Sequence, residues 1–546
     1  MITVKNFLIL LNLLNLLMKF ISIVRVTILI LITYVCGYSQ VKQEWVQRFG
    51  TEANQIYEIS GMTTDNSGNV FIGGSLKGAS LSDYFLIKYN SAGIQQWVST
   101  YTGLIEDRLI DMVIDSEGNI CVTGLSENQT GTYDIITIKY NTFGDSLWVK
   151  RFNGATAFAM DQPVALTADA NNNIYVCGYS FGNTPMTYIT IKYNPSGDSL
   201  WVARYPMSGT NLPRDITADE NGNIFVYGRG TTLIKYDQNG NIIWDRVYPF
   251  DAAESNKVLL NDKSGNIYFG AEKFTATFTD FAVVKLNSTG DTLWSRLYNG
   301  LGNTLTNHDE ISAVSLDNAG NIFLTGKIQA QSSFYFSTIK YNSAGEFQWE
   351  RNYSNINNGQ GGKDIITDNA GNVYVTGGSN DFMTIKYNTN GDSLWAMSYN
   401  GPSDLNDFAE VLAMDNAASI FVAGRSRMQQ VQGFFELAVV KYSQTITQIN
   451  TFNESSVFRL HQNYPNPFNP STNIKFEISN DSYVTLKIFD ILGKQITSIF
   501  NSSMNIGSYE YKFESDNLPG GIYFYELNVL SENQSYSEVK RMVLLK

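Results

Sequence analysis

A short motif that recurs about every fifty residues dominates this 546-residue chain. Each copy contains an Asp, two further residues, a Gly-Asn pair or a variant of it, and then an alternating apolar stretch. The copies begin at Asp65, Asp115, Asp169, Asp219, Asp262, Asp317, Asp368 and Asp415. Repetition at this period is typical of architectures in which one small unit is copied many times.

A second motif follows each copy of the first and consists of a Lys-Tyr segment, a turn with Gly, and a Trp. Its lysines are Lys88, Lys139, Lys192, Lys235, Lys285, Lys340, Lys386 and Lys441. Seven copies close with Trp97, Trp148, Trp201, Trp244, Trp294, Trp349 and Trp395, whereas Trp45 precedes the first copy and the copy at Lys441 has no Trp. These unmatched ends predict that the N-terminal and C-terminal segments pair and close a ring.

Each repeat predicts four short strands separated by turns in which Gly or Asn supplies positive φ. Four strands repeated radially predict an all-β fold, an eight-bladed β-propeller over residues 40–443 that is closed by the N-terminal strand. The paired motifs resemble the SBBP family of β-propeller repeats over about residues 41–443. That resemblance implies a fold and carries no catalytic residues to transfer.

Charge and composition exclude several classes of function. The formal net charge is -13, so no basic surface is expected for nucleic acid, and we predict none as a partner. The two histidines, His308 and His461, are too few and too far apart for a His-rich metal site. We expect a monomer.

Residues 1–39 have the features of a secretory signal peptide. Lys19 and Arg25 precede an apolar run, and Gly37 and Ser39 occupy the small-residue positions before a cleavage site at Gln40. Either Met1 or Met18 fits as the start. An uncleaved anchor and lipidation at Cys36 are alternatives. After cleavage Cys121 and Cys177 remain, and we predict two buried free thiols.

The repeated polar residues have a structural and a functional interpretation. We expect each repeat lysine to reach a carboxylate or a carbonyl between blades, the alternative being a lysine ring that binds a polyanion. We expect the turn Asp to accept backbone N–H bonds. No cofactor is predicted, although the hard oxygen ligands of this turn keep calcium as an alternative.

A less regular set of acids lies eight residues before the turn Asp, where the first strand of a blade begins. This position holds Asp107, Asp161, Glu254, Asp309 and Asp407, and Tyr57, Asn211 and Gln360 in the other repeats. Because first strands line a propeller channel, we predict an acidic rim that binds cations or a basic or hydroxyl-rich ligand. The alternative is that each acid accepts hydrogen bonds from loop amides.

The C-terminal residues have a different composition. Residues 444–458 predict a polar linker, and alternation with Gly and Pro over 459–546 predicts a small Ig-like β-sandwich. This segment resembles the type A C-terminal sorting domain of type IX secretion substrates. The match is carried by Asn463, Tyr464, Pro465, Asn466, Pro467, Phe468, Asn469 and Pro470, with Leu492, Gly493, Lys494, Gly521, Ile522 and Tyr523 further on. The resemblance implies recognition by the type IX export machinery.

The sequence therefore predicts an exported protein, secreted or held at the cell surface, that binds an extracellular glycan or protein. The competing prediction is a secreted enzyme that acts on polysaccharide or a small alcohol, with His308 and Asp309 near the channel mouth. We assign no catalytic residue, because no familiar catalytic motif is present and a single His in one repeat is weak support.

Overall fold

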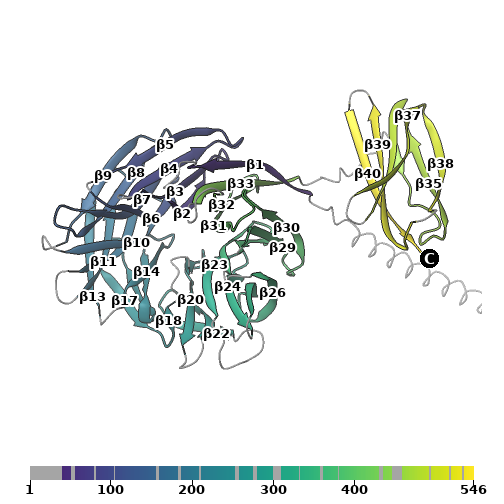
Figure 1. Ribbon diagram of the computed structural model, residues 1–546. Helices are drawn as coiled ribbons and strands as arrows, with labels where there is room; N and C mark the ends of the chain where they lie inside the picture. The colour runs from purple at the N-terminus through teal and green to yellow at the C-terminus, as the bar shows by residue number, and fades with distance from the viewer. Residues whose placement is uncertain are drawn as a thin grey trace, which may run out of the picture. The chain divides into compact units, whose positions relative to one another are not determined.

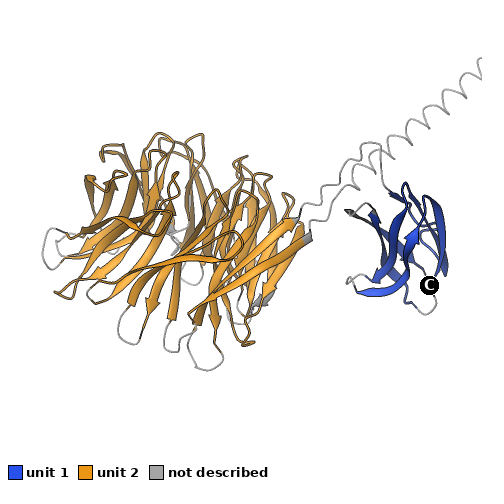
Figure 2. Cartoon of the chain, turned by 90° about the horizontal axis from the view of Figure 1, so that it is seen from above, with its two compact units in different colours: residues 1–37, 447–546 blue, residues 38–446 orange. Residues whose placement is uncertain are grey.

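A computed structural model describes residues 40–545 with gaps. The gaps are 51–55, 79–81, 104, 155–158, 182–185, 208–210, 253–257, 275–278, 299–308, 331–332, 357–360, 379, 429–434, 446–457, 491–493, 516–517 and 532–533. The chain divides into two compact units, one of residues 38–446 and one that contains 447–546 (Figure 2). The predicted signal peptide lies outside the described residues.

The first unit contains strands β1 to β33. They are β1 (Gln40–Phe49), β2 (Ile56–Thr64), β3 (Val70–Lys77), β4 (Ser82–Tyr89), β5 (Gln95–Tyr101), β6 (Asp107–Ile114), β7 (Ile120–Glu127), β8 (Tyr133–Tyr140), β9 (Ser146–Phe152), β10 (Met160–Ala168) and β11 (Ile174–Phe181). Next are β12 (Thr187–Tyr193), β13 (Ser199–Pro206), β14 (Pro213–Ala218), β15 (Ile224–Gly228), β16 (Thr232–Tyr236), β17 (Ile242–Val247), β18 (Asp251–Ala252), β19 (Leu259–Asn261), β20 (Ile267–Phe274), β21 (Thr279–Leu286) and β22 (Thr292–Tyr298). The last are β23 (Glu310–Leu316), β24 (Ile322–Ala330), β25 (Ser333–Tyr341), β26 (Phe347–Ile356), β27 (Gly362–Thr367), β28 (Val373–Gly377), β29 (Phe382–Tyr387), β30 (Ser393–Tyr399), β31 (Phe408–Met414), β32 (Ile420–Arg427) and β33 (Phe435–Thr445).

These strands form antiparallel sheets arranged around a centre (Figure 1). The groups β6–β9, β10–β13, β14–β17, β23–β26 and β27–β30 are four-stranded sheets in chain order, and β18–β22 form a five-stranded sheet. One eight-stranded sheet combines β2–β5 with β31, β32, β33 and β1, and a parallel bridge between Ile56 and Phe435 joins its two halves. The all-β propeller prediction is confirmed.

The two ends of this unit pair directly, as the unmatched motifs predicted. β1 runs antiparallel to β33, with Val46 opposite Val440 and Phe49 opposite Leu437. Trp45 Nε1 and Lys441 Nζ both donate to the Ser91 carbonyl, in the turn between β4 and β5, at 3.2 and 3.0 Å. The ring is therefore closed by a strand from the N-terminal end beside a strand from the C-terminal end.

The same arrangement, in which a repeat Lys and a repeat Trp donate to one carbonyl, recurs between neighbouring sheets, and we call it the Lys-Trp clamp. Lys88 and Trp97 both donate to Thr142 O, at 2.9 and 3.1 Å, and four further Lys-Trp pairs hold Gln238, Ser288, Ser343 and Thr389 in the same way. Lys139 instead pairs with Asp115 at 2.8 Å. The prediction that the lysines reach carbonyls and carboxylates is confirmed, and it explains how an ammonium tolerates burial.

The repeat Asp organises the hairpin turn between the first and second strands. Asp65 Oδ1 accepts hydrogen bonds from the backbone N–H groups of Ser67 and Asn69, while Asp65 Oδ2 accepts one from the Asn69 amide. Backbone N–H bonds of this kind recur at all eight turn aspartates. The turn prediction is confirmed. Cys121 and Cys177 are free and buried, as expected.

The second unit contains two antiparallel sheets that enclose one apolar core. One sheet has β34 (Phe458–Leu460), β35 (Ser471–Ile478) and β38 (Gly507–Glu514). The other has β36 (Ser482–Asp490), β37 (Gln495–Met504), β39 (Gly521–Ser531) and β40 (Gln534–Leu544). Within the described residues, no helix is both long and apolar enough to cross a membrane.

Candidate functional sites of the propeller and of the sorting domain

The predicted rim acids lie inside the protein and not on an open rim. Asp107, Asp161, Asp309 and Asp407 have 0% exposed surface, and Glu254 lies outside the described residues. The expected exposure is wrong for these four, whose side chains are enclosed at or near the starts of β6, β10, β23 and β31. Whether they bind a ligand remains a prediction.

Each described rim carboxylate is held by backbone N–H groups. Asp107 accepts from Gly103, Asp161 from Gly154 and Asp407 from Gly401. Asp309 Oδ1 accepts from the backbone N–H of Gln329 at 3.0 Å. This is the arrangement of the alternative interpretation, in which the acids satisfy neighbouring loop amides.

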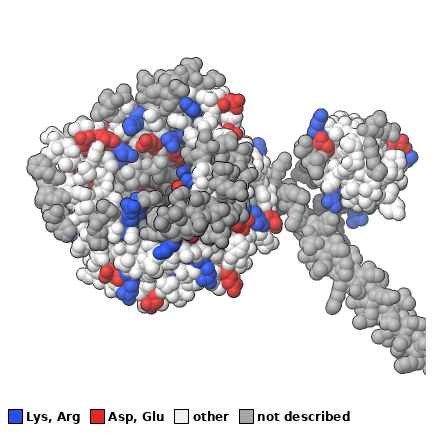
Figure 3. Space-filling view, turned by 60° about the horizontal axis from the view of Figure 1, so that its bottom comes forward, with Lys and Arg blue, Asp and Glu red and all other residues white. Residues whose placement is uncertain are grey.

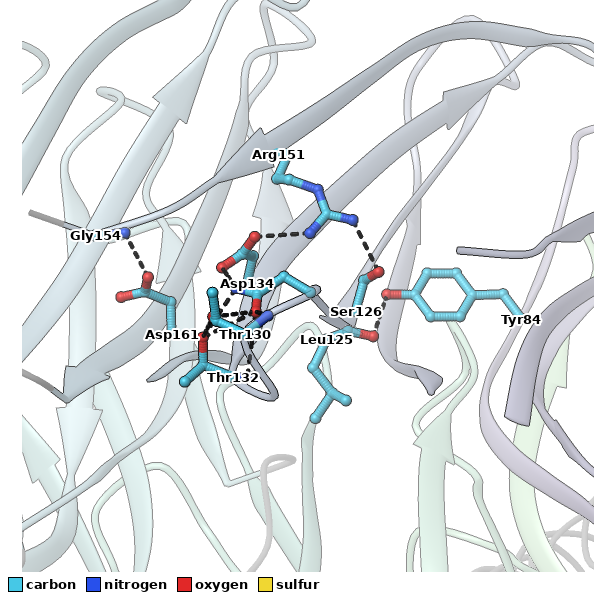
Figure 4. A network of polar contacts seen from close by, with 10 residues as sticks. Tyr84, Leu125, Ser126, Thr130, Thr132, Asp134, Arg151, Gly154 and Asp161 are labelled. Carbon is cyan, nitrogen blue, oxygen red and sulfur yellow. Dashed lines mark hydrogen bonds and ion pairs between the residues drawn. The ribbon is translucent and has the colours of Figure 1, made fainter. Parts of the chain in front are cut away.

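A charged network surrounds Asp134 in the β6–β9 sheet (Figure 4). Arg151 on β9 donates to Asp134 Oδ2 at 2.7 Å and to Ser126 Oγ at 3.0 Å. Ser126 lies opposite both Asp107 and Asp134 in the strand register. Sequence reasoning missed Asp134 and Arg151, although their fixed distances from the repeat Lys and Trp were a usable signal.

Burial dominates the acidity of these groups. Burial raises the pKa of Asp107, Asp161 and Asp407, and hydrogen bonds from backbone N–H and neighbouring serine hydroxyls oppose it. The nearby carboxylates of Asp83 and Asp134 raise the pKa of Asp107 and Asp161 further. These acids therefore hold protons more tightly than exposed carboxyls.

A second set of acids on the first strands was also missed. Asp111 Oδ2 accepts from Leu166 N at 2.9 Å, and Asp364 Oδ2 accepts from Leu412 N at 2.8 Å. Asp215 Oδ2 accepts from the N–H groups of residues 258 and 259 at 3.0 and 2.8 Å. Burial raises the pKa of Asp215 to about 8, against these hydrogen bonds. Each of the three acids thus ties the first strand of one sheet to the next sheet.

The proposed catalytic and metal-binding chemistry has little support within the described residues. His308 lies outside them, and His461 Nε2 contacts Glu477 in the C-terminal unit at 3.1 Å. In the described part of the chain, no three His, Cys, Asp or Glu side chains gather closely enough to hold a metal ion.

Exposed apolar side chains lie on the outer strands of four consecutive sheets, and single ones lie on β26 (Phe347) and β30 (Leu394). Those of the four consecutive sheets are Leu147, Val149, Leu200, Val202, Ile243, Val247, Leu293 and Leu297, on β9, β13, β17 and β22. At the position just before the repeat Trp, β5 and β26 carry Gln96 and Gln348 instead. We call these eight residues the apolar arc. On the face drawn in Figure 3, charges of both signs are intermixed.

The proline-rich motif of the C-terminal unit is fastened to the end of the chain. The Asn463 amide donates to Pro465 O and to Thr472 Oγ1, at 3.1 and 2.9 Å. Asn466 Oδ1 accepts from Val543 N at 2.8 Å, and buried Phe468 exchanges backbone hydrogen bonds with residues 543 and 545. Tyr464 remains 81% exposed. Gly493 of the predicted motif lies outside the described residues.

The comparison with known families decides the identity of this unit. Residues 462–544 match the family described as "Secretion system C-terminal sorting domain". The C-terminal unit is a secretion sorting domain. A sorting domain of this type indicates export to the cell surface or secretion, and it implies interaction with the type IX secretion machinery. Residues 44–75 match the family described as "Beta-propeller repeat".

More distant similarities concern the propeller. An uncharacterized WD repeat-containing protein, L264 of Acanthamoeba polyphaga mimivirus, is 24% identical over 201 residues, which are 27% of this chain and 14% of that protein. Regulatory protein FlaEY of Caulobacter vibrioides is 24% identical over 183 residues, which are 31% of this chain and 18% of that protein. The chain thus spans less than a fifth of either relative.

Similar solved structures include BamB from Moraxella catarrhalis and Sqt1 from Chaetomium thermophilum. BamB is 12% identical with a TM-score of 0.40, and the match covers 77% of this chain and 99% of BamB. Sqt1 is 8% identical with a TM-score of 0.49, and the match covers 74% of this chain and 99% of Sqt1.

Proposed function

We propose that this protein is an exported binding protein whose propeller recognises an extracellular protein. The proposal combines the sorting domain, which indicates export, with the apolar arc on the propeller's outer strands. Exposed apolar surface that spans several elements is typical of protein interaction sites, whereas isolated exposed apolar residues are common and need no explanation. The arc is the single observation that carries the binding role.

The repeated polar groups support this assignment because their hydrogen bonds hold the scaffold together, which leaves ligand binding to other residues. Repeat lysines, tryptophans and turn aspartates make their hydrogen bonds within the scaffold. Recognition therefore falls to exposed residues that the scaffold does not use, and the apolar arc is made of such residues. An extracellular protein with a complementary apolar surface is the ligand that this chemistry fits, and a glycan, which prefers hydrogen-bonding groups, fits it less well.

We also propose that the propeller has eight blades. Dividing the eight-stranded sheet at its parallel bridge yields β2–β5 and a blade made of β31, β32, β33 and β1. With the six remaining sheets, this count equals the number of repeat motifs. An Ig-like topology for the sorting domain is part of the same proposal.

Variants of the arc test the binding role. Leu147→Gln and Leu200→Gln place in the arc the residue that already occupies the equivalent positions 96 and 348, so we expect both variants to fold. Leu394→Gln, in the same position on β30 but outside the arc, is the matched control. The full chain is screened against panels of extracellular matrix proteins and against a glycan array, with and without calcium.

Binding to a matrix protein that weakens at least tenfold in both arc variants and persists in Leu394→Gln supports the proposal. Binding confined to glycans, or protein binding that both arc variants retain, contradicts it. Turnover of a polysaccharide or a small alcohol that is lost on changing His308 or Asp309 instead favours the enzyme. Deletion of residues 459–546 tests export separately and is expected to keep the chain inside the cell envelope.

A further inference from the structure

The third strand of a repeat carries an acid that accompanies the rim acid of the following sheet. Five residues before the repeat Lys, the chain has Asp83, Asp134, Thr187, Gly230, Asp280, Tyr335, Asp381 and Glu436. Four of these acids precede a rim acid in the next sheet, as the pairs Asp83 and Asp107, Asp134 and Asp161, Asp280 and Asp309, Asp381 and Asp407. Thr187 and Tyr335 are followed instead by neutral Asn211 and Gln360, whereas Gly230 precedes Glu254 and Glu436 is followed around the ring by Tyr57, so two repeats depart from the pairing.

Backbone contacts place the members of these pairs next to each other. Ser82 and Glu106, which immediately precede Asp83 and Asp107, form a parallel bridge. Asp309 N donates to Thr279 O at 2.9 Å, and Asp407 N donates to Asn380 O at 2.7 Å. Two like charges held together repel each other, so either a proton or a positive charge between them is needed to stabilise such a pair.

One pair shows how that charge can be supplied. Asp134 is bound by Arg151 of its own fourth strand at 2.7 Å, three residues after the repeat Trp. Glu436 is bound in the same way by Arg48, three residues after Trp45. The equivalent positions beside Asp83, Asp280 and Asp381 hold Thr100, Leu297 and Ser398. These three pairs have no arginine from the strand that supplies one to Asp134 and Glu436.

The pair between β4 and β6 also has unused ligand atoms. Asp83 Oδ1 and Asp107 Oδ1 are shielded from solvent and accept no hydrogen bond of normal geometry among the described residues, and the same is true of Asp161 Oδ1 and Asp280 Oδ1. Asp107 is fully buried and uses its other oxygen for the Gly103 N–H. Arg151 lies within electrostatic reach of Asp107, but its guanidinium is bonded to Asp134 and Ser126. Buried carboxylate oxygens without partners are costly unless something binds them.

We propose that the Asp83 and Asp107 pair binds a divalent cation, calcium, in the place that Arg151 fills beside Asp134. Two carboxylates supply hard oxygen ligands, and backbone carbonyls and water complete the shell. Because only two acidic side chains contribute, the affinity belongs to the weak range of extracellular modules, a Kd of about 0.1 to 1 mM. This site is independent of the protein-binding role proposed above.

Calcium titration of the full chain by calorimetry and thermal unfolding tests the proposal. We expect calcium binding and a rise in the unfolding midpoint in the wild type. Asp83→Asn and Asp107→Asn each lose the calcium-binding heat and the rise in unfolding midpoint that come from this site. The double variant loses no more of either than one single variant does. Glu220→Gln, which removes a charge from an exposed surface position, retains the signals.

A gain-of-charge variant keeps the test valid if the asparagine variants fold poorly. Thr100 lies opposite Phe85 as Arg151 lies opposite Ile136, so Thr100→Arg brings a guanidinium to Asp83. We expect it to abolish calcium binding at this site without lowering the unfolding midpoint measured without calcium. Terbium luminescence sensitised by nearby Tyr84 reports the same site.

The proposal is overturned if calcium up to about 10 mM leaves the midpoint unchanged, or if Asp83→Asn and Thr100→Arg retain the full calcium response. It is also overturned if calcium has no effect while Asp107→Asn stabilises the protein at neutral pH. In that case the two carboxyls share a proton and no cation.

Discussion

At the scale of single residues, the surroundings of an aspartate decide what it does in this protein. Burial raises the pKa of Asp115, but Lys139 and Asn119 outweigh it, so the net shift is downward and the carboxylate stays charged. Burial raises the pKa of Asp107, and no comparable partner compensates. The same residue type is therefore an ion-pair member in a turn and a carboxyl with raised pKa at an interface between sheets.

Asp215 predicts a pH dependence of stability. Its pKa in the folded state is raised to about 8, so folding favours the protonated form, and the stability it contributes is lost as the pH rises from about 4 through 8. We expect the free energy of unfolding of Asp215→Asn to exceed that of the wild type by about 1 to 3 kcal/mol at pH 9. At pH 4 we expect the two free energies to differ little. Urea unfolding at the two pH values measures this difference. An equal effect at both contradicts the assignment.

At the scale of the element, the Gly turn before the outer strand shows how two sheets constrain one residue. Gly144 has a φ of +88°, and a Cβ there lies 2.7 Å from the Trp97 ring of the preceding sheet. The turn therefore requires Gly both for its left-handed conformation and for the approach of the Trp that completes the Lys-Trp clamp.

A pair of alanine variants separates these two requirements. Gly144→Ala and Gly265→Ala both place Ala at positive φ, but the nearest atom to a Cβ at Gly265 is 3.7 Å away. We expect about 1 to 2 kcal/mol of destabilisation from the backbone in both variants. Overpacking against Trp97 adds a further 1 to 3 kcal/mol in Gly144→Ala. Urea midpoints of the two variants provide the comparison, and equal losses contradict a role for the Trp contact.

Element-level patterns also mark the limit of what the sequence predicts. The lysines, tryptophans and turn glycines were predictable because each recurs at a fixed place in all or nearly all of the repeats. The burial of the rim acids was not predictable, because it depends on backbone N–H groups of neighbouring loops that the alternation of apolar residues does not report. Asp134 and its equivalents were missed because their position also holds Thr187, Gly230 and Tyr335.

At the scale of the whole molecule, the ring depends on one interface whose partners are far apart in sequence. Lys441 and Ser91 are 350 positions apart, whereas Lys88 and Thr142 are 54 apart. The contacts are the same, but covalent connections hold the interior interface together while the closing interface has only its side chains and the β1–β33 pairing. The entropy of closing a longer loop is also larger. Opening of the propeller should therefore begin where β1 leaves β33.

Matched double variants test this order of opening. Trp45→Phe with Lys441→Met removes both donors to Ser91 O, and Trp97→Phe with Lys88→Met removes both donors to Thr142 O. Each leaves one carbonyl without these partners, at a cost of about 1 to 3 kcal/mol. We expect the first variant to accelerate amide exchange along the whole β1–β33 ladder and to expose the N-terminal strand to protease, because its unpairing leaves two free ends. The second variant should loosen only its own turn, because the chain on either side keeps the sheets together. Equal and local exchange in both would mean that the closing interface is as strongly held as the others, and that the ring opens at no preferred place.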